Sequence, residues 1–600
     1  MTIPYIKNNK LSPTDIEQFN FNDFTGGLNN RSTPMTLKDN EAQDISNMSF
    51  IADGSVEKRW GTELYDAIEM ATAVTYTDVY RPIDSAEVII RATATKVYAG
   101  AVLIATVTGQ IQGVNYIGNY YFVDGTNMYV YDGTKVYTIK EPTHAYLASG
   151  AAGGTAVITI AVWDSRIAVG DFIQLEGING TETGEIDSID ESALTVTFTA
   201  NTTLAFLADE LIRFYIPLND TYYTGVSQSD ETLNIKWYEP CANELDDAYK
   251  GECYIPVNCV CIQYDSQRLY VAGDPDHPNE IYIGDINNPY YFPVALGMQC
   301  SPNGDVIKDL IQFDDAIVVG RTDDIYAIYG ETNDYTLANT FVIKKLDTHT
   351  GFVSINNARL GHNYMFFVGS DMNVYAMSTP RGDSETLSTT IVNKDKIILS
   401  EAPISLTNAD IANSPAIFFE DEYIFIADDK LIVYNYIYRA WTIYEDLLPT
   451  YMVIKDNELL IGTSDGFIIE RSTTYSDRGV AITASYKSGQ YSLGSPINFK
   501  DFMDVYLVTY AYDDYDSSVT LSNLIDYYET KSTSDVDTLL SRFGTAVFGD
   551  LLISNNVAQS DNIPINIRGR TYTFLFGNKT VDEPMKVYQI SGTYKVRGTR

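Results

Sequence analysis

Positive charge is scarce in this sequence. Forty Lys and Arg residues stand against 80 Asp and Glu residues, which gives a formal net charge of −40 at pH 7. Proteins that clamp nucleic acid bind its phosphates through Lys and Arg, so this composition argues against a nucleic-acid clamp. The negative charge is compatible with a surface that repels DNA and equally with plain solubility.

Long apolar stretches are also missing. The chain has no apolar run long enough to span a bilayer, so the sequence predicts no membrane span. Its first fifteen residues, MTIPYIKNNKLSPTD, contain no apolar stretch of the kind found in secretory signals. We therefore expect neither a secretory signal nor a transmembrane segment.

Cysteine is rare, and its arrangement argues against disulfides. The five cysteines are Cys241, Cys253, Cys259, Cys261 and Cys300. An odd number without metal-ligand spacing is not the pattern of a disulfide framework. Two of them stand two residues apart in VNCVCIQY, so we expect them to share one face of a strand as small buried side chains.

Residue patterns typical of catalysis are scarce as well. The four histidines, His144, His277, His349 and His362, lie far apart, and no HExxH, CxxC or phosphate-binding loop is present. Carboxylates are abundant, so residue type alone does not exclude a glycosidase pair. The oxygen-rich stretches 273–280 and 510–518 lack EF-hand spacing and are interpreted as solvated turns. We expect no catalytic residues, no cofactor and no metal, and hence not an enzyme.

The residues that are plentiful indicate β-structure. There are 46 tyrosines and 40 glycines, helical periodicity is nearly absent, and short apolar runs end repeatedly at Gly, Asp or Asn. One unit recurs: a strand, a short polar turn and a second strand, as in NYYFVDGTNMYVYDGTKVYTI (119–139). A tyrosine recurs at the same place in these units: Tyr129, Tyr282, Tyr326, Tyr375 and Tyr434.

The spacing of these units predicts the fold. It is roughly 40 to 55 residues, the range of β-propeller blades. We predict an all-β chain: a β-propeller with an inserted small β-barrel and a C-terminal β-sandwich-like domain, with an array of β-sandwiches as the competing interpretation. The expected domains are an extended N-terminal arm or strap (1–69), a first propeller segment (70–142), the inserted barrel (143–215), a second propeller segment (216–475) and the C-terminal β domain (476–600).

Two segments carry unusual charge. Within the insert, residues 164–213 contain ten acidic and two basic residues, whereas the last 35 residues of the chain contain seven basic and two acidic ones. The basic end could dock an acidic neighbour through Arg568, Arg570, Arg597 and Arg600. Ordinary edge-strand cations that prevent aggregation explain it equally well.

The stretch FTGGLNNRSTPMTLKDNEAQDISNMSFIADGSVEKRWG (24–61) is the most specific segment of the sequence. It is rich in turn residues and poor in apolar ones, so no core is expected within it. It resembles the N-terminal signature of the tail nozzle proteins of short-tailed bacteriophages, also called tail tubular protein B. The matching residues, here called the N-terminal signature, are Gly26, Gly27, Leu28, Asn29, Pro34, Asp39, Asn47, Gly54, Arg59 and Gly61.

The resemblance implies a structural virion protein. It implies a homo-oligomer, a hexameric ring of propeller-bearing subunits at the distal end of a phage tail, with a channel for DNA ejection. Implied partners are the adaptor and portal-side proteins above, tail fibres or tail-tip proteins, and genomic DNA that passes without binding. The implied location is the virion tail, after synthesis in the host cytoplasm. The alternative is a propeller that binds or hydrolyses glycans of the host surface.

Overall fold

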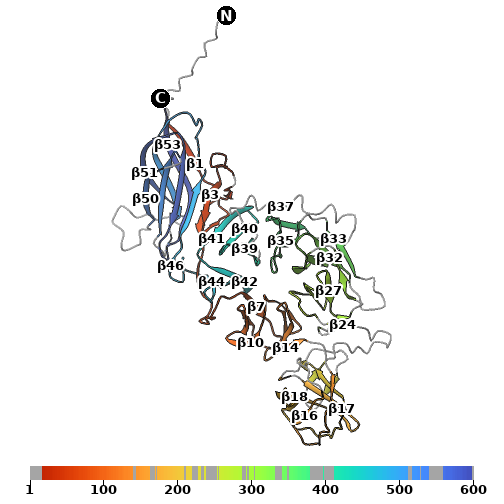
Figure 1. The fold of residues 1–600 in the computed structure, drawn as a ribbon. Coiled ribbons are helices and arrows are strands. Elements are labelled where there is room, and N and C mark those ends of the chain that lie inside the picture. The colour runs from red at the N-terminus through yellow and green to blue at the C-terminus, as the bar shows by residue number, and fades with distance from the viewer. Residues whose placement is uncertain are drawn as a thin grey trace. The chain divides into compact units, whose positions relative to one another are not determined.

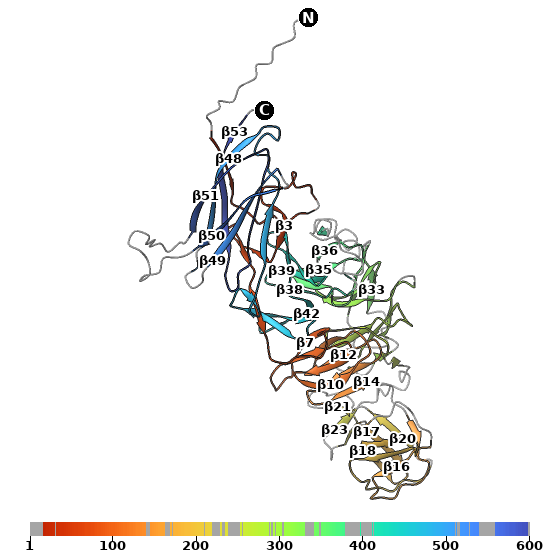
Figure 2. The same cartoon turned by 60° about the vertical axis from the view of Figure 1, so that its left-hand side comes forward.

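The computed structural model describes residues 16–597 with gaps, and the chain is all-β, as predicted (Figures 1 and 2). The segments outside the description are 1–15, 31, 140–143, 162–168, 171, 209–210, 216, 219–252 apart from strands β22 and β23, 255, 287–288, 290–291, 294–295, 303–304, 331–340, 347–349, 379–410 apart from β37, 412, 511, 513–516, 527–528, 539–557 and 598–600. The described residues form 53 strands in twelve sheets.

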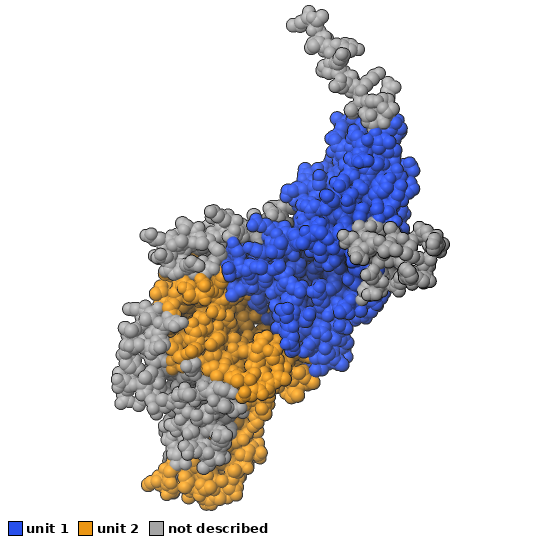
Figure 3. Space-filling model, turned by 180° about the vertical axis from the view of Figure 1, so that it is seen from behind, with its two compact units in different colours: residues 1–75, 359–377, 394–600 blue, residues 76–358, 378–393 orange. Residues whose placement is uncertain are grey.

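The chain divides into two compact units, coloured separately in Figure 3. Unit 1 comprises residues 1–75, 359–377 and 394–600, and unit 2 comprises residues 76–358 and 378–393. Unit 1 therefore contains both ends of the sequence, and unit 2 contains most of its middle.

Unit 2 contains four successive four-stranded antiparallel sheets. Their strands are β7 (Tyr76–Tyr80), β8 (Val88–Ala92), β9 (Lys96–Ala99) and β10 (Val102–Thr106); β11 (Gln112–Tyr116), β12 (Asn119–Val123), β13 (Met128–Tyr131) and β14 (Val136–Ile139); β25 (Cys261–Asp265), β26 (Arg268–Ala272), β27 (Glu280–Ile283) and β29 (Met298–Gln299); β30 (Asp309–Phe313), β31 (Ala316–Gly320), β32 (Ile325–Tyr329) and β33 (Val342–Lys345). Two smaller sheets contain β21 (Pro217–Leu218), β22 (Gln228–Asp230) and β23 (Ile235–Trp237), and β24 (Cys253–Tyr254) and β28 (Phe292–Pro293).

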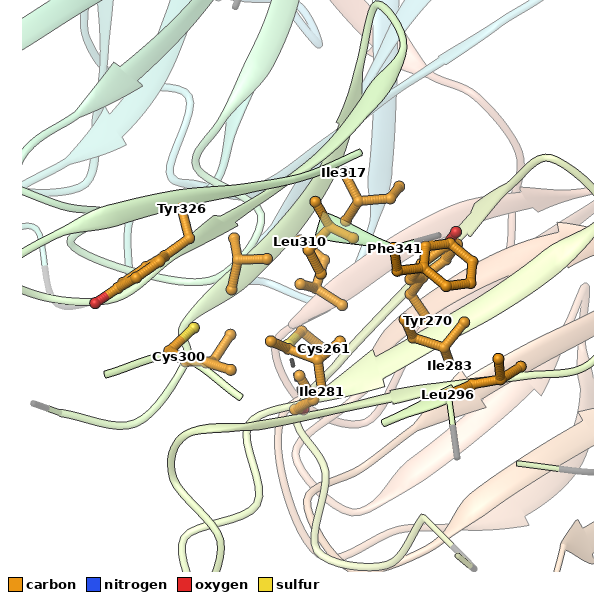
Figure 4. Close-up of a cluster of buried hydrophobic side chains, with 14 residues drawn as sticks. Cys261, Tyr270, Ile281, Ile283, Leu296, Cys300, Leu310, Ile317, Tyr326 and Phe341 are labelled. Atoms are coloured by element: carbon orange, nitrogen blue, oxygen red, sulfur yellow. Dashed lines mark hydrogen bonds between the residues drawn. The ribbon is translucent and has the colours of Figure 1, made fainter. Parts of the chain in front are cut away.

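Consecutive sheets of unit 2 pack through shared apolar layers. The first strands β7, β11, β25 and β30 contact one another in that order. One buried cluster lies between the β11–β14 and β25–β29 sheets, and a second, drawn in Figure 4, joins the β25–β29 and β30–β33 sheets. A four-stranded meander packed in this way has the strand order of a propeller blade. Closure of all such sheets into one propeller remains a prediction.

The two close-spaced cysteines illustrate this packing, and one prediction about them is wrong. Both side chains are buried, as expected, but they belong to different clusters: Cys259 to the first and Cys261 to the second. Strand β25 begins only at Cys261, and Cys259 packs in the same cluster as Ile262, the residue after Cys261. Regular strand alternation therefore does not extend back to Cys259, and the two cysteines do not share a strand face.

The insert forms a sheet of its own. Its six strands are, in spatial order, β15 (His144–Tyr146), β20 (Leu211–Tyr215), β17 (Phe172–Gly177), β18 (Gly180–Asp190), β19 (Thr195–Phe198) and β16 (Val157–Thr159). A bridge between Leu147 and Ile160, just beyond the two edge strands, closes the sheet on itself. Its interior is a separate apolar cluster that includes Ile173, Val196 and Phe206. The insert thus has its own core.

Unit 1 contains three more sheets with the blade strand order. Their strands are β34 (Arg359–Gly361), β35 (Tyr364–Val368), β36 (Val374–Ser378) and β37 (Lys396–Ile397); β38 (Ala416–Phe419), β39 (Glu422–Ala427), β40 (Lys430–Asn435) and β41 (Ala440–Tyr444); β42 (Pro449–Lys455), β43 (Glu458–Thr463) and β44 (Ile468–Ser472), to which β6 (Gly61–Leu64), β45 (Ser476–Asp477) and β46 (Val480–Ala481) are added. The fourth strand of the last sheet, β6, comes from the start of the chain.

The rest of unit 1 is a sandwich of two six-stranded sheets. One contains β4 (Met48–Phe50), β5 (Val56–Lys58), β53 (Lys586–Val596), β48 (Lys500–Tyr510), β51 (Ala558–Gly569) and β1 (Ile16–Phe21); the other contains β2 (Gly27–Leu28), β3 (Glu41–Ser46), β47 (Ala484–Ser488), β52 (Tyr572–Asn578), β49 (Ser517–Ile525) and β50 (Glu529–Thr538). The ring of Tyr572 on one sheet lies 5.0 Å from that of Phe19 and 5.4 Å from that of Phe502 on the other. Aromatic packing therefore forms the core of the sandwich.

Within the predicted N-terminal arm or strap (1–69), the described residues 16–64 contain strands β1–β6 of these sheets. Strands β1–β5 pair with the C-terminal strands β47 and β53 or with each other, and β6 completes the last blade-like sheet. The segment has few apolar side chains, and several of them are fully buried, including Phe24, Ile45 and Met48. The segment lacks a core of its own because its core partners lie hundreds of residues away in the sequence.

The predicted Asp-Gly turns are present, with the expected backbone. Gly125 and Gly133 have φ values of 81° and 94°. In each turn the preceding aspartate caps the loop: Asp132 Oδ1, for example, accepts the N–H groups of Thr134 and Lys135 at 2.7 and 2.8 Å. The glycine is required because residues with a Cβ rarely adopt this φ.

Gly133→Val should lower the free energy of unfolding by about 1–3 kcal/mol, the cost of holding a non-glycine residue at such a φ. A Cβ here would also lie 3.1 Å from the hydroxyl of Tyr80. Thr134→Val is the matched control, because it places the same side chain in the same turn at a residue without positive φ. Equal urea midpoints for the two variants would show that backbone strain at Gly133 is not the deciding factor.

Candidate functional site: the N-terminal signature

The centre of the signature is a buried arginine. Arg59 is fully buried, and its guanidinium binds both carboxylate oxygens of Asp477, at 2.9 and 2.6 Å. It also donates to the carbonyl oxygens of Trp60 and Glu445, at 2.9 and 3.1 Å, and lies over the ring of Tyr444. A buried charge is stable only when it is paired and its hydrogen bonds are satisfied, and both conditions hold here.

Asn47 is the second signature residue at this centre. Its Oδ1 accepts hydrogen bonds from Arg59 Nε and from the N–H of Glu445, both at 2.8 Å, and its Nδ2 donates to the carbonyl oxygen of Thr483. Its φ of 56° is in the left-handed region, which Asn tolerates better than most residues. One side chain therefore connects the end of strand β5, the end of β41 and the segment before β47.

Three signature glycines lie where a side chain would collide with the backbone. A Cβ on Gly26 would lie 2.6 Å from the carbonyl oxygen of Asn40, and one on Gly61 2.4 Å from that of Ser476. Gly27 has a φ of 68°, and its Cβ would lie 2.7 Å from the backbone nitrogen of Trp441 in β41. These glycines allow the N-terminal strands to approach the last blade-like sheets closely.

The remaining signature residues fix the loops between these strands. Asn29 Nδ2 donates to the carboxylate of Glu41 at 3.0 Å. Burial tends to raise the pKa of Glu41, but hydrogen bonds from Lys38 and Asn29 outweigh burial and hold that pKa below its usual value. Leu28 is buried in β2. The carbonyl oxygens of Pro34 and Asp39 accept hydrogen bonds from the N–H of Gln490 and the hydroxyl of Tyr491. The carbonyl oxygen of Gly54, whose φ is 87°, accepts one from the N–H of Phe24.

The signature is therefore an internal joint of unit 1. Its residues tie the N-terminal strands to the sandwich and to the sheet that ends in β41. The hydrogen bonds of these residues hold strands and loops together, so the role that the structure gives the signature is architectural.

Sequence reasoning missed the partners of this joint. Asp477 is one of 80 acidic residues and stands 418 positions from Arg59. The sequence around Arg59, VEKRWG, gave no signal of burial, and nothing local identified which carboxylate would pair with it.

The four arginines of the predicted docking site do not act as one group. Arg568 and Arg597 both bind Asp501, at 2.7 and 2.5 Å, and hydrogen bonding to Arg568 is the main cause of the lowered pKa of Asp501. Arg570 lies with its guanidinium 4.6 Å from the centre of the Phe499 ring. Arg600 lies outside the described residues. Some of the basic charge at this end is thus neutralised within the chain.

The recurrent tyrosines have a structural role. The hydroxyl groups of four of them lie at hydrogen-bond distance from an aspartate in the preceding loop, in the pairs Tyr129–Asp124, Tyr282–Asp274, Tyr326–Asp324 and Tyr375–Asp371, at 2.5–3.4 Å. Because burial removes the hydroxyl from water, the pKa values of Tyr129, Tyr282 and Tyr375 are raised. At four of the five positions, a tyrosine on the third strand of a four-stranded sheet therefore contacts an aspartate in the loop before that strand, and this contact fixes the loop.

Neither a metal-binding cluster nor a membrane-crossing helix is found among the described residues. In the described portion of the chain, no group of three or more His, Cys, Asp or Glu side chains could hold a metal ion. Over the same residues, no helix combines the length and apolar character needed to cross a membrane.

Comparisons with known proteins do not assign a family. No family model and no curated protein matches the chain. Among solved structures, the computationally designed Ika8 protein is similar at a TM-score of 0.31 and 11% identity, over 68% of this chain and 99% of that one. Exo-beta-1,3-galactanase from Phanerochaete chrysosporium is similar at a TM-score of 0.22 and 10% identity, over 56% of this chain and 94% of that one. The phage phi92 endosialidase is similar at a TM-score of 0.20 and 9% identity, over 78% of this chain and 71% of that one. At TM-scores below 0.5, these likenesses carry no argument about function.

Proposed function

We propose that this chain is a structural component of a phage tail, a nozzle-like ring that forms the distal end of the DNA-ejection channel and a platform for other tail proteins. The observation that carries the proposal is the joint built by Asn47, Arg59 and the signature glycines. The resemblance to tail nozzle proteins rests on these residues, and in this chain they determine architecture. Because these residues determine how the subunit is built, we infer that the chain has the subunit architecture of the tail nozzle proteins.

The charge of the chain supports a conduit role. A channel for DNA should not bind phosphates, because each Lys or Arg contact must break for DNA to slide. Six of the 40 basic residues are withdrawn from the surface, each 0–2% exposed: Lys58, Arg59, Arg91, Arg268, Arg321 and Lys500. The cations left to meet DNA are therefore even fewer than the composition suggests.

The proposal includes specific partners. The ring is a hexamer of this chain, placed in the virion tail below adaptor and portal-side proteins and above tail fibres or tail-tip proteins. The acidic insert, with a core of its own, is suited to contact a neighbour without disturbing the sheets beside it.

Purified full-length protein tests the proposal through its mass and its affinity for DNA. Since one chain has a mass of 66.9 kDa, a hexamer is expected at about 400 kDa by light scattering, with a central opening in electron micrographs. Duplex DNA should not bind at physiological salt, and lowering the salt should not induce binding.

Two outcomes would contradict the proposal. A monomer at every concentration, or tight and salt-sensitive DNA binding, would exclude the ring with a repulsive channel. Release of reducing sugar from host envelopes would instead favour the glycan-hydrolysing alternative.

A further inference from the structure

Lys58 is a lysine almost completely removed from water. It ends strand β5, and it is 1% exposed. Its Nζ donates to Asn578 Oδ1 at 2.9 Å and to the carbonyl oxygens of Thr580 and Glu583 at 3.0 and 3.1 Å. Burial, assisted by the adjacent positive charge of Arg59, lowers the pKa of Lys58 to about 8. A large share of this side chain is therefore the neutral, nucleophilic amine in mildly alkaline solution.

Asn578, which ends strand β52, is held in one orientation. Its Oδ1 accepts a second hydrogen bond, from the N–H of Thr580 at 3.1 Å. Its Nδ2 donates to the carbonyl oxygen of Ser518 at 2.8 Å and to Glu583 Oε2 at 3.3 Å. Glu583 Oε2 in turn accepts the Ser518 hydroxyl at 2.5 Å. The amide oxygen thus faces the lysine, and the amide nitrogen contacts a carboxylate.

We propose that Lys58 and Asn578 form an intramolecular isopeptide bond, with Glu583 as the catalytic acid and base. The lone pair of the neutral Nζ attacks Cγ of Asn578, and the Nζ–Cγ bond forms. The negative charge that develops on Oδ1 is stabilised by the Thr580 N–H. One proton passes from Nζ to Nδ2 with Glu583 Oε2 as relay, the Cγ–Nδ2 bond breaks, and ammonia leaves. No oxidant or other reactant is needed.

The site has the features that this reaction requires. Nζ and the amide group of Asn578 are already adjacent, so attack requires only that Nζ lose a proton and turn its lone pair from Oδ1 toward Cγ. Asn578 is only 5% exposed, which limits competing hydrolysis of its amide by water. The bond would join strand β5 of one sheet to strand β52 of the other, across 520 residues of sequence. It would fasten the N-terminal strands to the sandwich covalently.

A second buried lysine provides an internal control. Lys500 is also 1% exposed, and burial lowers its pKa as well. Its Nζ donates to three backbone carbonyl oxygens, those of Ser495, Asn498 and Arg570. These contacts include no side-chain amide with a carboxylate beside it, so Lys500 shares the burial of Lys58 but not its reaction partners.

Mass spectrometry of the denatured full-length protein tests the proposal. The wild-type chain, incubated at a pH above the pKa of Lys58, is expected to weigh less than its sequence mass by one ammonia molecule. Proteolysis should then yield a branched peptide that contains Lys58 and Asn578. Glu583→Gln keeps both reacting groups and the side-chain shape, and should slow ammonia loss about 100-fold or more. Lys500→Met should lose ammonia as the wild type does.

Several results would overturn the proposal. One is a wild-type mass equal to the sequence mass after that incubation. A second is ammonia loss that persists in Lys58→Met, because it would come from succinimide formation at an asparagine. A third is an unchanged rate in Glu583→Gln, whose folding is checked by circular dichroism.

Discussion

Arg59→Met is expected to lower the free energy of unfolding by about 3–5 kcal/mol, the usual cost of breaking a buried ion pair by removing one partner. Methionine retains the apolar bulk but leaves the carboxylate of Asp477 and the Oδ1 of Asn47 without the hydrogen bonds that Arg59 donates. Because this joint connects the N-terminal strands to the rest of unit 1, the loss should appear as a lower midpoint in urea unfolding. Loss of soluble expression is the more extreme form of the same result.

Two further variants separate the charge effect from general damage. Arg59→Met combined with Asp477→Asn should regain some of the lost stability, since no unpaired charge then stays buried. Arg568→Met removes an arginine from an exposed pair with Asp501 and should leave the midpoint nearly unchanged. A small effect of Arg59→Met, equal to that of Arg568→Met, would contradict the role given to the joint.

Raising the pH above 10 should unfold the protein steeply. Tyr120, Tyr444, Tyr486 and Tyr572 are 0–1% exposed, and burial raises the pKa of each well above the ordinary value of 10. Above pH 10 the unfolded chain releases these protons and the folded chain keeps them, so stability falls as pH rises. Each tyrosine contributes a slope of about 1.4 kcal/mol per pH unit, and the four together about 5.5. That slope exhausts a typical stability within about one to three pH units.

The measurement follows tyrosinate absorbance and circular dichroism together during alkaline titration. The buried tyrosines should ionise in step with unfolding, after the exposed ones have titrated. Tyr572→Phe removes one of these groups and should make the pH dependence shallower by about 1.4 kcal/mol per unit. Complete tyrosine ionisation with intact circular dichroism would refute the prediction.

The proposed cross-link and the buried ion pair occupy adjacent residues of the chain. Lys58 reaches into the sandwich at Asn578, and Arg59 reaches Asp477 next to the last blade-like sheet. Two neighbouring cations thus fasten the beginning of the chain to two regions of unit 1. These contacts hold a segment with few apolar residues against the rest of unit 1.

The sequence by itself determined the features that depend on neighbouring residues. Alternating apolar positions and the abundance of Tyr and Gly indicated an all-β chain, and the Asp-Gly pairs correctly located turns with positive φ at Gly125 and Gly133. The repeated tyrosines marked equivalent strands. These properties are local because side-chain alternation and turn geometry depend on a few consecutive residues.

Only the tertiary structure decided which distant segments belong together. The N-terminal stretch was expected to be an extended arm or strap, yet its strands pair with β47 and β53 near the other end of the chain. Arg59 finds Asp477, Lys58 finds Asn578, and Cys259 and Cys261 enter different cores. Many strands of a β-rich chain offer similar edges and faces, so pairing is selected by the packing and hydrogen bonding of the whole domain, which no short stretch of sequence encodes.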